Sequence, residues 1–363
     1  MEDCILVTGG AGFIGSNFIL DWLQREEASI VNLDKLTYAA NPLTVRELEQ
    51  NERYKLVRAD VCDEHAVVDV LTRERPRAVV HFAAETHVDR SLHFPKAFLE
   101  TNVTGTHTLL LATLRYWQAL TQGQRDGFRF VHISTDEVYG SLAMDDLPVR
   151  ENAPYAPSSP YSATKAAADQ LVGSFYRTYS LPVVTVVPSN NFGPRQFPEK
   201  LIPLMIRNAL RGECLPIYGS GLNVRDWIYV GDQCAAVRVV AARGRAGERY
   251  HVGGGNQIAN LDLVRELCAV LDELRPTSRP GGYASLIAFV EDRPAHDLRY
   301  ALDCLKIADE LGWRPEHDFR TALRTTVRWY LDREEWLAQV DSETYRNWLA
   351  TNYPVDRYRL QNG

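Results

Sequence analysis

The sequence predicts an α/β protein built on a doubly wound parallel sheet, with a smaller mixed α/β lobe beside it. Two observations carry this prediction: apolar segments of strand length recur through the first half of the chain, and longer segments with helical spacing separate them. Strands that are apolar throughout are typical of parallel sheets, because the crossover helices cover both faces. A right-handed, doubly wound arrangement is therefore expected.

The elements of the first 188 residues follow in order. The expected strands are Cys4–Val7, Ile30–Leu33, Tyr54–Val57, Ala78–Phe82, Phe128–Ile133 and Val183–Val187. The expected helices between them are Phe13–Leu23, Ala66–Thr72, Ala97–Leu120 and Ala163–Tyr179. This alternation predicts one sheet domain over residues 1–188.

After Pro188 the pattern becomes mixed. Further helices are expected at Leu201–Arg211, Gln233–Ala242, Leu261–Leu274 and Leu305–Leu311, with short strands at Leu215–Tyr218 and Trp227–Val230. We expect the chain to return to the first domain around residues 226–252. Residues 189–225 and 253–363 then form most of an interleaved second lobe.

Composition narrows the class of protein. Hydrophobic residues make up 45% and charged residues 24% of the 363 residues, as in soluble globular proteins. The net charge of −7 comes without a block of like charges, so we expect neither a nucleic acid nor a membrane as partner. We find no signal peptide and no CxxC among the six cysteines, which predicts a cytoplasmic protein with reduced thiols.

A glycine-rich loop, TGGAGFIG at residues 8–15, follows the first strand and opens the first helix. Glycines at positions 9, 12 and 15 permit a tight turn and let the backbone approach a pyrophosphate at the helix N-terminus. Asp34 ends the second strand, nineteen residues after Gly15, where a carboxylate binds the ribose hydroxyls of a dinucleotide. This context predicts an NAD-binding Rossmann domain, although Lys35 next to the acid weakens the preference for NAD over NADP.

Polar residues follow several other strands of the expected sheet. They are Asp60, the segment Ala83–Glu85, the segment Ser134–Glu137 and the pair Asn190–Asn191. In an open parallel sheet, ligands bind outside the carboxyl ends of the strands. We therefore expect the site at this edge.

Two groups of residues carry the candidate chemistry. Tyr161 and Lys165 stand at i and i+4 on one helix face, where the ammonium stabilises a phenolate that acts as a base. Asp136 and Glu137 are adjacent carboxylates at a strand end. They suit either a solvated turn or a pocket in which one acts as acid and the other as base.

The histidines indicate no metal site. His81, His87 and His93 are six residues apart, which matches neither zinc-ligand spacing nor one helix face. His81, in an apolar strand, is expected to pack in the core.

Together these motifs resemble the extended short-chain dehydrogenases/reductases and, within them, the dTDP-glucose 4,6-dehydratase family. The similarity covers nearly the whole chain and includes STDEVYG at 134–140, SPYSATK at 159–165, SNNFGP at 189–194, FPEKLIP at 197–203, RDW at 225–227 and DRPAHD at 292–297. The STDE segment is the most specific element, because related epimerases carry another residue at Asp136. The chain departs from the family pattern at Thr86, Phe192, Arg195, Gln196 and Ala295.

The resemblance implies NAD as cofactor, dTDP-glucose as substrate and a role for each catalytic residue. Tyr161, helped by Lys165 and Thr135, deprotonates the C4 hydroxyl while NAD takes the C4 hydride. Glu137 then removes the C5 proton and Asp136 protonates the departing C6 hydroxyl, after which the hydride returns to C6.

The resemblance also implies two sets of binding residues. The cofactor site comprises Gly9, Gly12, Phe13, Ile14, Gly15, Asp34, Lys35, Thr37, Asp60, Val61, Ala83, Thr101, Tyr161, Lys165 and Asn191. The nucleotide-sugar site comprises Thr86, Thr135, Asn190, Lys200, Leu201, Pro216, Ile217, Tyr218, Arg225, Asn260, Arg293, His296 and Tyr300. The basic members of the second set are suited to a diphosphate.

Family members form homodimers through a four-helix bundle, for which Ala97–Leu120 and Ala163–Tyr179 are the candidates here. Three alternatives stay open: a nucleotide-sugar 4-epimerase, a dehydratase for another nucleotide sugar, and a catalytically inactive dinucleotide sensor. Asp136 argues against the epimerase, since epimerisation needs no acid for a leaving hydroxyl. The presence of Asp136, Glu137 and the Tyr161–Lys165 pair together argues against the sensor, which needs none of them.

Overall fold

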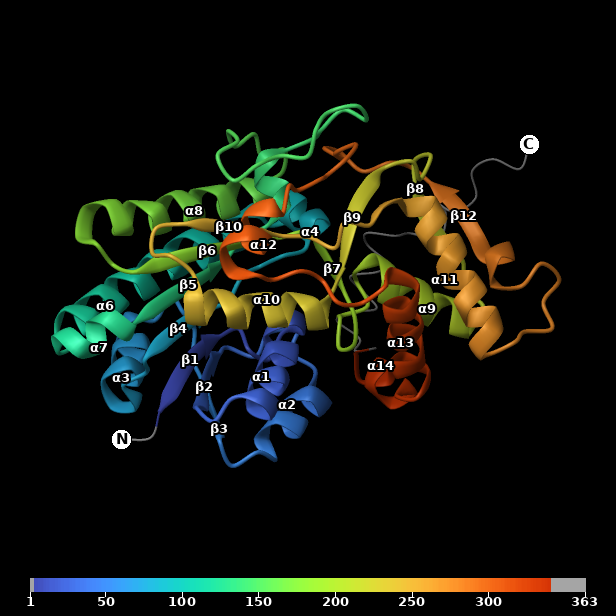
Figure 1. Cartoon of the computed structure of the whole chain (residues 1–363). Coiled ribbons are helices and arrows are strands. Elements are labelled where there is room, and N and C mark those ends of the chain that lie inside the picture. The colour runs from blue at the N-terminus through green and yellow to red at the C-terminus, as the bar shows by residue number, and fades with distance from the viewer. Residues whose placement is uncertain (1–2, 341–363) are drawn as a thin grey trace.

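A seven-stranded parallel sheet forms the centre of the N-terminal lobe in the computed structural model, which describes residues 3–340 (Figure 1). The strand order is β10-β6-β5-β4-β1-β2-β3, which confirms the predicted doubly wound sheet. The strands are β1 (Cys4–Thr8), β2 (Ser29–Asp34), β3 (Tyr54–Arg58), β4 (Ala78–His81), β5 (Arg129–Ile133), β6 (Val183–Pro188) and β10 (Arg249–Val252).

Both faces of this sheet are covered, which explains why its strands are apolar throughout. In β1, Cys4 and Leu6 pack into one hydrophobic core, whereas Ile5 and Val7 pack into the other. The first core includes side chains of α3 (Glu64–Glu74), α6 (Thr106–Gln118) and α8 (Pro160–Tyr179). The second includes side chains of α1 (Phe13–Arg25) and α10 (Val230–Arg243). Successive side chains of a strand point to opposite faces, so both sets must be apolar.

The segment that carries α10 and β10 returns to the first sheet after an excursion into the second lobe. β10 pairs in parallel with β6, so that Arg249 stands opposite Thr185. The sequence prediction contained no strand at residues 249–252, because a four-residue strand at a sheet edge has too little length to show a period. The end of the expected second lobe, residues 341–363, lies outside the described residues.

The expected long helix over residues 97–120 is interrupted. The structure has α5 (Pro95–Phe98), a π-helical segment η1 (Leu99–Gly105) and then α6. Within η1, Asn102 hydrogen bonds to both backbone groups of Glu85, at 2.8 Å and 3.0 Å, and to Thr164 Oγ1 at 3.0 Å. Short π segments often occur at functional sites. Here one residue of the widened turn bridges the loop after β4 and α8.

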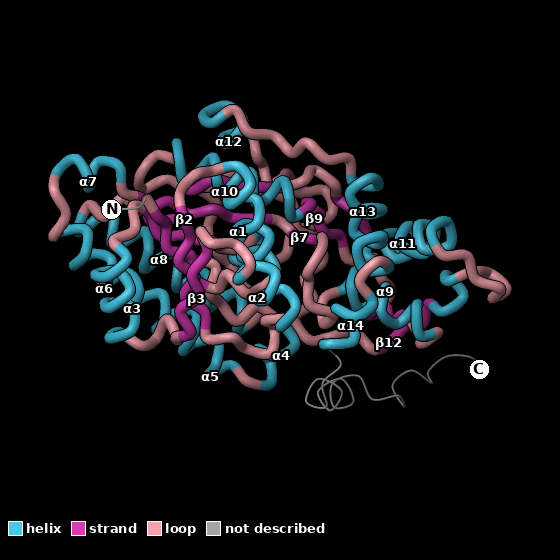
Figure 2. Tube along the Cα trace, turned by 90° about the horizontal axis from the view of Figure 1, so that it is seen from below, coloured by secondary structure: helices cyan, strands magenta, loops and turns pink. Residues whose placement is uncertain are grey.

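The second lobe is built from two small sheets and a layer of helices. A mixed sheet contains β7 (Asn190–Phe192), β9 (Val224–Tyr229) and β11 (Gln257–Ala259), and a parallel pair contains β8 (Leu215–Tyr218) and β12 (Ile287–Val290). Its core joins these strands to α9 (Leu201–Arg211), α11 (Asn260–Leu274), α13 (Phe319–Leu331) and α14 (Glu334–Val340). Figure 2 shows this lobe beside the first sheet.

The remaining elements connect these layers. They are α2 (Pro42–Glu49), α4 (Val88–His93), α7 (Gln122–Gly127), the 3₁₀ helices η2 (Asp136–Tyr139) and η3 (Tyr283–Leu286), and α12 (Leu305–Leu311). Strand order reverses between β1 and β4, so the loops that follow these two strands separate there. Such a switch point is where doubly wound sheets bind ligands. In the part of the chain that the structure describes, no helix has the length and apolar character to cross a membrane.

Candidate active site

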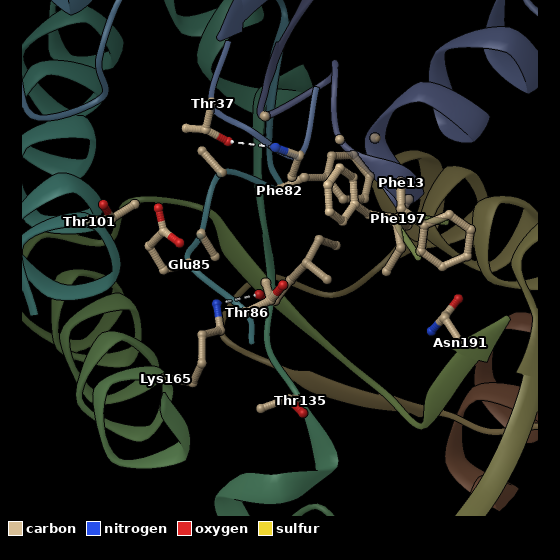
Figure 3. Close-up of a pocket in the computed structure, with 18 of the residues that line it drawn as sticks. Phe13, Thr37, Phe82, Glu85, Thr86, Thr101, Thr135, Lys165, Asn191 and Phe197 are labelled. Carbon is tan, nitrogen blue, oxygen red and sulfur yellow. Dashed lines mark hydrogen bonds between the residues drawn. The ribbon is translucent and has the colours of Figure 1, made fainter. Parts of the chain in front are cut away.

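A cavity runs along the carboxyl ends of the strands of the first sheet (Figure 3). Every residue that the sequence assigned to the cofactor lines it: Gly9, Gly12, Phe13, Ile14, Gly15, Asp34, Lys35, Thr37, Asp60, Val61, Ala83, Thr101, Tyr161, Lys165 and Asn191. Thr86 and Thr135 line the same cavity. These residues span 183 positions of the chain, and the parallel sheet brings them together at one edge.

The glycine loop shows which of its members the backbone itself requires. Gly9 has φ +72°, and a Cβ there would lie 2.5 Å from the backbone nitrogen of Ala83. A Cβ on Gly15 would lie 2.4 Å from the carbonyl oxygen of Gly9. At Gly12, by contrast, a Cβ would meet only that same oxygen, at an ordinary 3.4 Å. The space above Gly12 is therefore kept open for something other than protein.

The first turn of α1 faces this open space. Gly12 is its N-cap residue, and no side chain caps the helix. Helix N-termini of this kind bind anions, because their N–H groups have no partner within the helix. The open glycine and the uncapped helix together fit the pyrophosphate of NAD.

Asp34 is fixed at the end of β2 by two backbone donors. The amides of Ala11 and Leu36 donate to its two carboxylate oxygens, at 2.9 Å and 2.7 Å. Each oxygen keeps a second lone pair for the ribose hydroxyls. Beside it, Lys35 pairs with Asp60 at 3.3 Å and lies 3.4 Å from Thr101 Oγ1. The lysine is thus held by an acid of the same site.

A second cavity lies between the two lobes and joins the first. All the remaining residues assigned to the substrate line it: Asn190, Lys200, Leu201, Pro216, Ile217, Tyr218, Arg225, Asn260, Arg293, His296 and Tyr300. Four residues line both cavities, namely Glu137, Asn190, Glu199 and Lys200. Glu137 therefore stands where a molecule in the second cavity meets one in the first.

Three cations surround the second cavity, and each is held in place. Lys200 Nζ donates to the carbonyl oxygen of Thr86 at 2.7 Å. Arg225 donates to the carbonyl of Asp297 at 2.8 Å and lies over the ring of Tyr300 at 4.3 Å. Arg293 pairs with Asp89 at 3.2 Å. Arg225 is buried, and its hydrogen bonds within residues 3–340 go to backbone carbonyls. Because no carboxylate accepts from it there, an anion in the cavity gains a charge-assisted contact with this guanidinium.

The adjacent acids occupy different environments. Asp136 is 4% exposed, and its Oδ2 atom finds no hydrogen-bond partner among residues 3–340. Burial, with the charges of Glu137 and Asp226, raises its pKa well above the usual value. Burial also raises the pKa of Glu137, but three cations counter this shift: Arg293, Lys200 and Arg225. Asp136 is therefore the member of the pair whose environment more strongly favours the protonated form.

Tyr161 and Lys165 lie on the first two turns of α8, and Figure 3 shows Lys165 reaching from that helix into the cavity. Lys165 Nζ donates to the carbonyl oxygen of Ile133 at 2.7 Å. The expected lowering of the Tyr161 pKa by Lys165 is not seen. Burial and the charge of Glu137 raise that pKa, and a hydrogen bond with Thr135 works in the opposite direction. The spacing placed the two groups in one cavity but did not account for burial of the phenol.

Several lining residues were absent from the sequence prediction. The clearest is Glu199, a 6% exposed carboxylate that accepts a hydrogen bond from Tyr38 OH at 3.1 Å. Phe82 and Phe197 also line the first cavity. Glu199 follows Phe197-Pro198 in a loop, where spacing alone indicates no role. Its position becomes evident only when the second lobe folds against the first.

Two further expectations concern residues near the site. His81 is 2% exposed and lies between two hydroxyls, Thr8 Oγ1 at 2.7 Å and Thr106 Oγ1 at 3.0 Å, as a packed core residue. Within residues 3–340 no group of three metal-binding side chains gathers. Of the positions that depart from the family pattern, neither Arg195 nor Ala295 lines either cavity. Arg195 instead pairs with Glu47 at 2.7 Å.

Comparison with known proteins agrees with this geometry. The family model described as GDP-mannose 4,6 dehydratase matches residues 6–326. A dTDP-glucose 4,6-dehydratase of Shigella flexneri is 49% identical over 96% of this chain and 98% of its own length. One from Xanthomonas campestris pv. campestris strain B100 is 52% identical over 94% and 97%.

Solved structures show the same relationship. A dTDP-glucose 4,6-dehydratase from Streptomyces venezuelae, solved with NAD bound, has a TM-score of 0.83 and 43% identity over 92% of this chain and 98% of its own. A UDP-glucose 4-epimerase from Thermotoga maritima, solved with UDP-glucose, has a TM-score of 0.78 and 26% identity over 90% and 98%. Identity is much higher with the dehydratases than with the epimerase. The chain therefore belongs to the dTDP-glucose 4,6-dehydratase family of NAD-dependent short-chain dehydrogenases/reductases.

Proposed function

We propose that the protein converts dTDP-glucose to dTDP-4-keto-6-deoxyglucose and water, using NAD that stays bound through the turnover. One observation carries this proposal beyond the family assignment. Burial raises the pKa of Asp136 well above its usual value, whereas three cations oppose the same shift in Glu137, and both acids lie near Tyr161. An acid next to a base at a hydride-transfer site is what removal of water requires and what simple oxidation does not.

The first step is removal of the C4 hydroxyl proton by Tyr161. Because burial raises the pKa of this phenol, its proton leaves only when positive charge lies close. Lys165, one turn further along α8, is the cation that we assign to this task, and Thr135 hydrogen bonds to the phenol oxygen. NAD held by the glycine loop and Asp34 would supply hydride transfer between C4 and C6 and would be regenerated within one turnover.

Elimination follows at C5 and C6. The new C4 ketone acidifies the neighbouring C5 hydrogen, and Glu137 removes it as a proton. Asp136 donates a proton to the C6 oxygen, the C6–O bond breaks, and water leaves as a C5–C6 double bond forms. Glu137 then gives its proton back to C5 when the hydride returns to C6. The proton gained by Tyr161 equals the one lost by Asp136, so the step sequence balances.

The cations of the second cavity hold the nucleotide diphosphate in this proposal. Lys200, Arg225 and Arg293 supply three positive charges around a cavity in a protein of net charge −7. The apolar and amide side chains that line the same cavity, including Leu201, Ile217 and Asn260, are assigned to the base and its ribose. This arrangement supports a nucleoside diphosphate sugar, and we propose thymine as its base.

The test uses the purified protein with dTDP-glucose and no added NAD. The expected product has lost one water and carries a 4-keto group, shown by mass spectrometry and by reaction with a carbonyl reagent. UDP-glucose and GDP-mannose serve as matched controls for the base and the sugar. Recovery of dTDP-galactose would show a 4-epimerase instead, and no change in any of the three sugars would contradict an enzyme of this class.

We also propose a homodimer and a cytoplasmic location. Segment η1–α6 packs against α8 on one side of the first sheet, and Leu99, Tyr176 and Tyr179 are exposed there. Two such helical layers from two copies form a four-helix bundle. Six cysteines without a CxxC motif suit a reducing compartment. Light scattering after size-exclusion chromatography tests the dimer: a mass of one chain at micromolar concentration would contradict it.

A further inference from the structure

A buried carboxylate that the proposed mechanism does not use lies directly behind the catalytic groups. Asp169 stands one turn after Lys165 on α8 and is 2% exposed. It lines neither cavity. Burying an ionisable side chain costs free energy unless hydrogen bonds or opposite charges compensate it. The partners of Asp169 therefore indicate what this carboxylate does.

Asp169 accepts three hydrogen bonds, all from uncharged groups. The donors are Ser134 Oγ at 2.7 Å, Tyr155 OH at 2.6 Å and His132 Nε2 at 3.0 Å. Burial lowers the pKa of His132 to about 4, so the imidazole is neutral at physiological pH. Its Nδ1 atom has no partner among the described residues, which agrees with a lone pair there and a proton on Nε2.

These hydrogen bonds stabilise the ionised form of Asp169. Burial works to raise its pKa, but His132, Lys165 and Ser134 together bring the pKa below the usual value. None of the three donors neutralises the carboxylate, which therefore carries a full negative charge. The cation that faces it on the same helix is Lys165, because side chains at i and i+4 are neighbours.

Lys165 is in the opposite situation. Its side chain is 4% exposed, and its Nζ donates a hydrogen bond to the carbonyl of Ile133 and not to a carboxylate. Burial lowers its pKa to about 8, and the charge of Asp169 is what raises it against burial. Without that charge, a lysine in this position loses its proton more readily.

We propose that Asp169 is a positioning residue of the active site, whose buried negative charge keeps Lys165 protonated and whose contact with Ser134 ties the turn of Thr135–Glu137 to α8. This rests on the proposed function, in which Lys165 must be a cation to assist Tyr161. Asp169 touches neither substrate nor cofactor in this account and acts only through other side chains.

The groups around Asp169 come from four elements, and none replaces its role. β5 contributes His132, the residue after it is Ser134, and the loop before α8 contributes Tyr155. Tyr139 of η2 and Arg249 of β10 lie beyond Tyr155: the ring of Tyr155 contacts Tyr139 and lies 4.9 Å from the guanidinium.

Arg249 and Lys165 are both cations near Asp169, but only Lys165 lies on the same helix as Tyr161 and Asp169. Arg249 donates to the carbonyl of Glu151 at 2.9 Å and lowers the pKa of His132. Lys165 shares a helix with both Tyr161 and Asp169. The charge of Asp169 also raises the pKa of Tyr161, so an unaccompanied anion there would oppose catalysis. Asp169 therefore assists Tyr161 only together with the positive charge of Lys165.

The test measures the titration of Lys165 itself rather than turnover. The full-length protein is labelled with trace acetic anhydride across a pH series, and the peptide containing Lys165 is quantified by mass spectrometry. In Asp169→Asn, the midpoint is expected to fall by at least about one unit, a tenfold rise in unprotonated lysine. Asp169→Glu is expected to restore most of the shift. Tyr155→Phe, which removes one hydrogen bond but keeps the charge, is expected to leave the midpoint nearly unchanged.

An unchanged Lys165 midpoint in folded Asp169→Asn, or an equal shift in Tyr155→Phe, would overturn the proposal. The unmodified protein gives a second test that needs no variant to fold. Its Lys165 is expected to titrate at about 8, and a midpoint below pH 7 would mean that Asp169 does not keep it protonated. Labelling requires no substrate, so failure of the proposed dehydration in the product assay is a separate result.

Discussion

The two cavities that meet at Glu137 are built in different ways. The first is shaped by backbone at the ends of parallel strands, with glycines where side chains would collide with Ala83 or with the loop itself. The second is shaped by charged and aromatic side chains that come from both lobes, such as Asp89, Arg225 and Arg293. The first site therefore depends on local shape, whereas the second depends on charges brought together by the complete fold. In the proposed mechanism, the reaction takes place where the two cavities meet, at Glu137.

Removing the base at this junction is expected to have the largest effect. Tyr161→Phe keeps the ring that contacts Phe98 but removes the group that takes the C4 proton. General-base catalysis typically contributes 10²–10⁴-fold, so kcat is expected to fall by about that factor. Stopped-flow absorbance of NADH should show no reduction on mixing with substrate. Reduction at the wild-type rate would mean that another group removes the proton.

A smaller effect is expected from the charges of the second cavity alone. Arg293→Ala removes one charge-assisted contact, worth about 1.5–3 kcal/mol, so KM should rise by about 10- to 150-fold. The amount of NAD that copurifies should stay the same, because Arg293 does not line the first cavity. Arg265→Ala, at an exposed site on α11, is the matched control. An equal rise of KM in both variants would show that the charge is not used locally.

The glycine loop separates shape from ligand contact. Gly9→Ala places a Cβ against backbone at a positive φ and is expected to cost about 1–3 kcal/mol in folding free energy even without NAD. Gly12→Ala has room in the protein itself, so its thermal stability without NAD should equal that of wild type. Retention of NAD should nevertheless weaken in Gly12→Ala. Full retention of NAD there would contradict the pyrophosphate position.

The dependence on pH is expected to be the mildest effect and to distinguish the two acids. Glu137 must be ionised, and burial raises its pKa, so activity is lost as pH falls through that raised value. Asp136 must be protonated, and its pKa is raised further, so activity is lost as pH rises through it. The profile of kcat should be bell-shaped, with both limbs above the range of ordinary carboxylic acids. Asp136→Asn should remove the alkaline limb, and its persistence would assign that limb elsewhere.

The sequence predicted features that depend on local spacing better than features that depend on the complete fold. Local signals predicted most of the first sheet, because each apolar segment and the spacing around it can be read over a few residues. The glycine loop and Asp34 both lie within the first 34 residues, and the structure joins them through the hydrogen bond from the Ala11 amide to Asp34. Tyr161 and Lys165, which their spacing places on one helix face, both line the first cavity. The pKa of Tyr161 was not predictable, because it depends on burial and on Glu137, which only the fold places nearby.

Contacts between residues far apart in the chain show the limit more clearly. Strand β10 and the π segment around Asn102 depend on pairing partners far along the chain, so spacing gave no sign of them. Glu199 reaches both cavities because its loop packs against Tyr38, 161 residues earlier. Asp169 was not singled out at all. Its partners come from β5 and from the loop before α8, and no periodic pattern links them.

The central claim is that Asp136 and Glu137 divide the elimination between them while Tyr161 serves the oxidation. The double variant Asp136→Asn with Glu137→Gln tests it most directly, because both replacements keep size and remove proton transfer. Mixed with dTDP-glucose in a stopped-flow spectrometer, it is expected to form NADH rapidly and then hold it, with little loss of water. Turnover to the 4-keto-6-deoxy product at the wild-type rate, without accumulated NADH, would contradict the account.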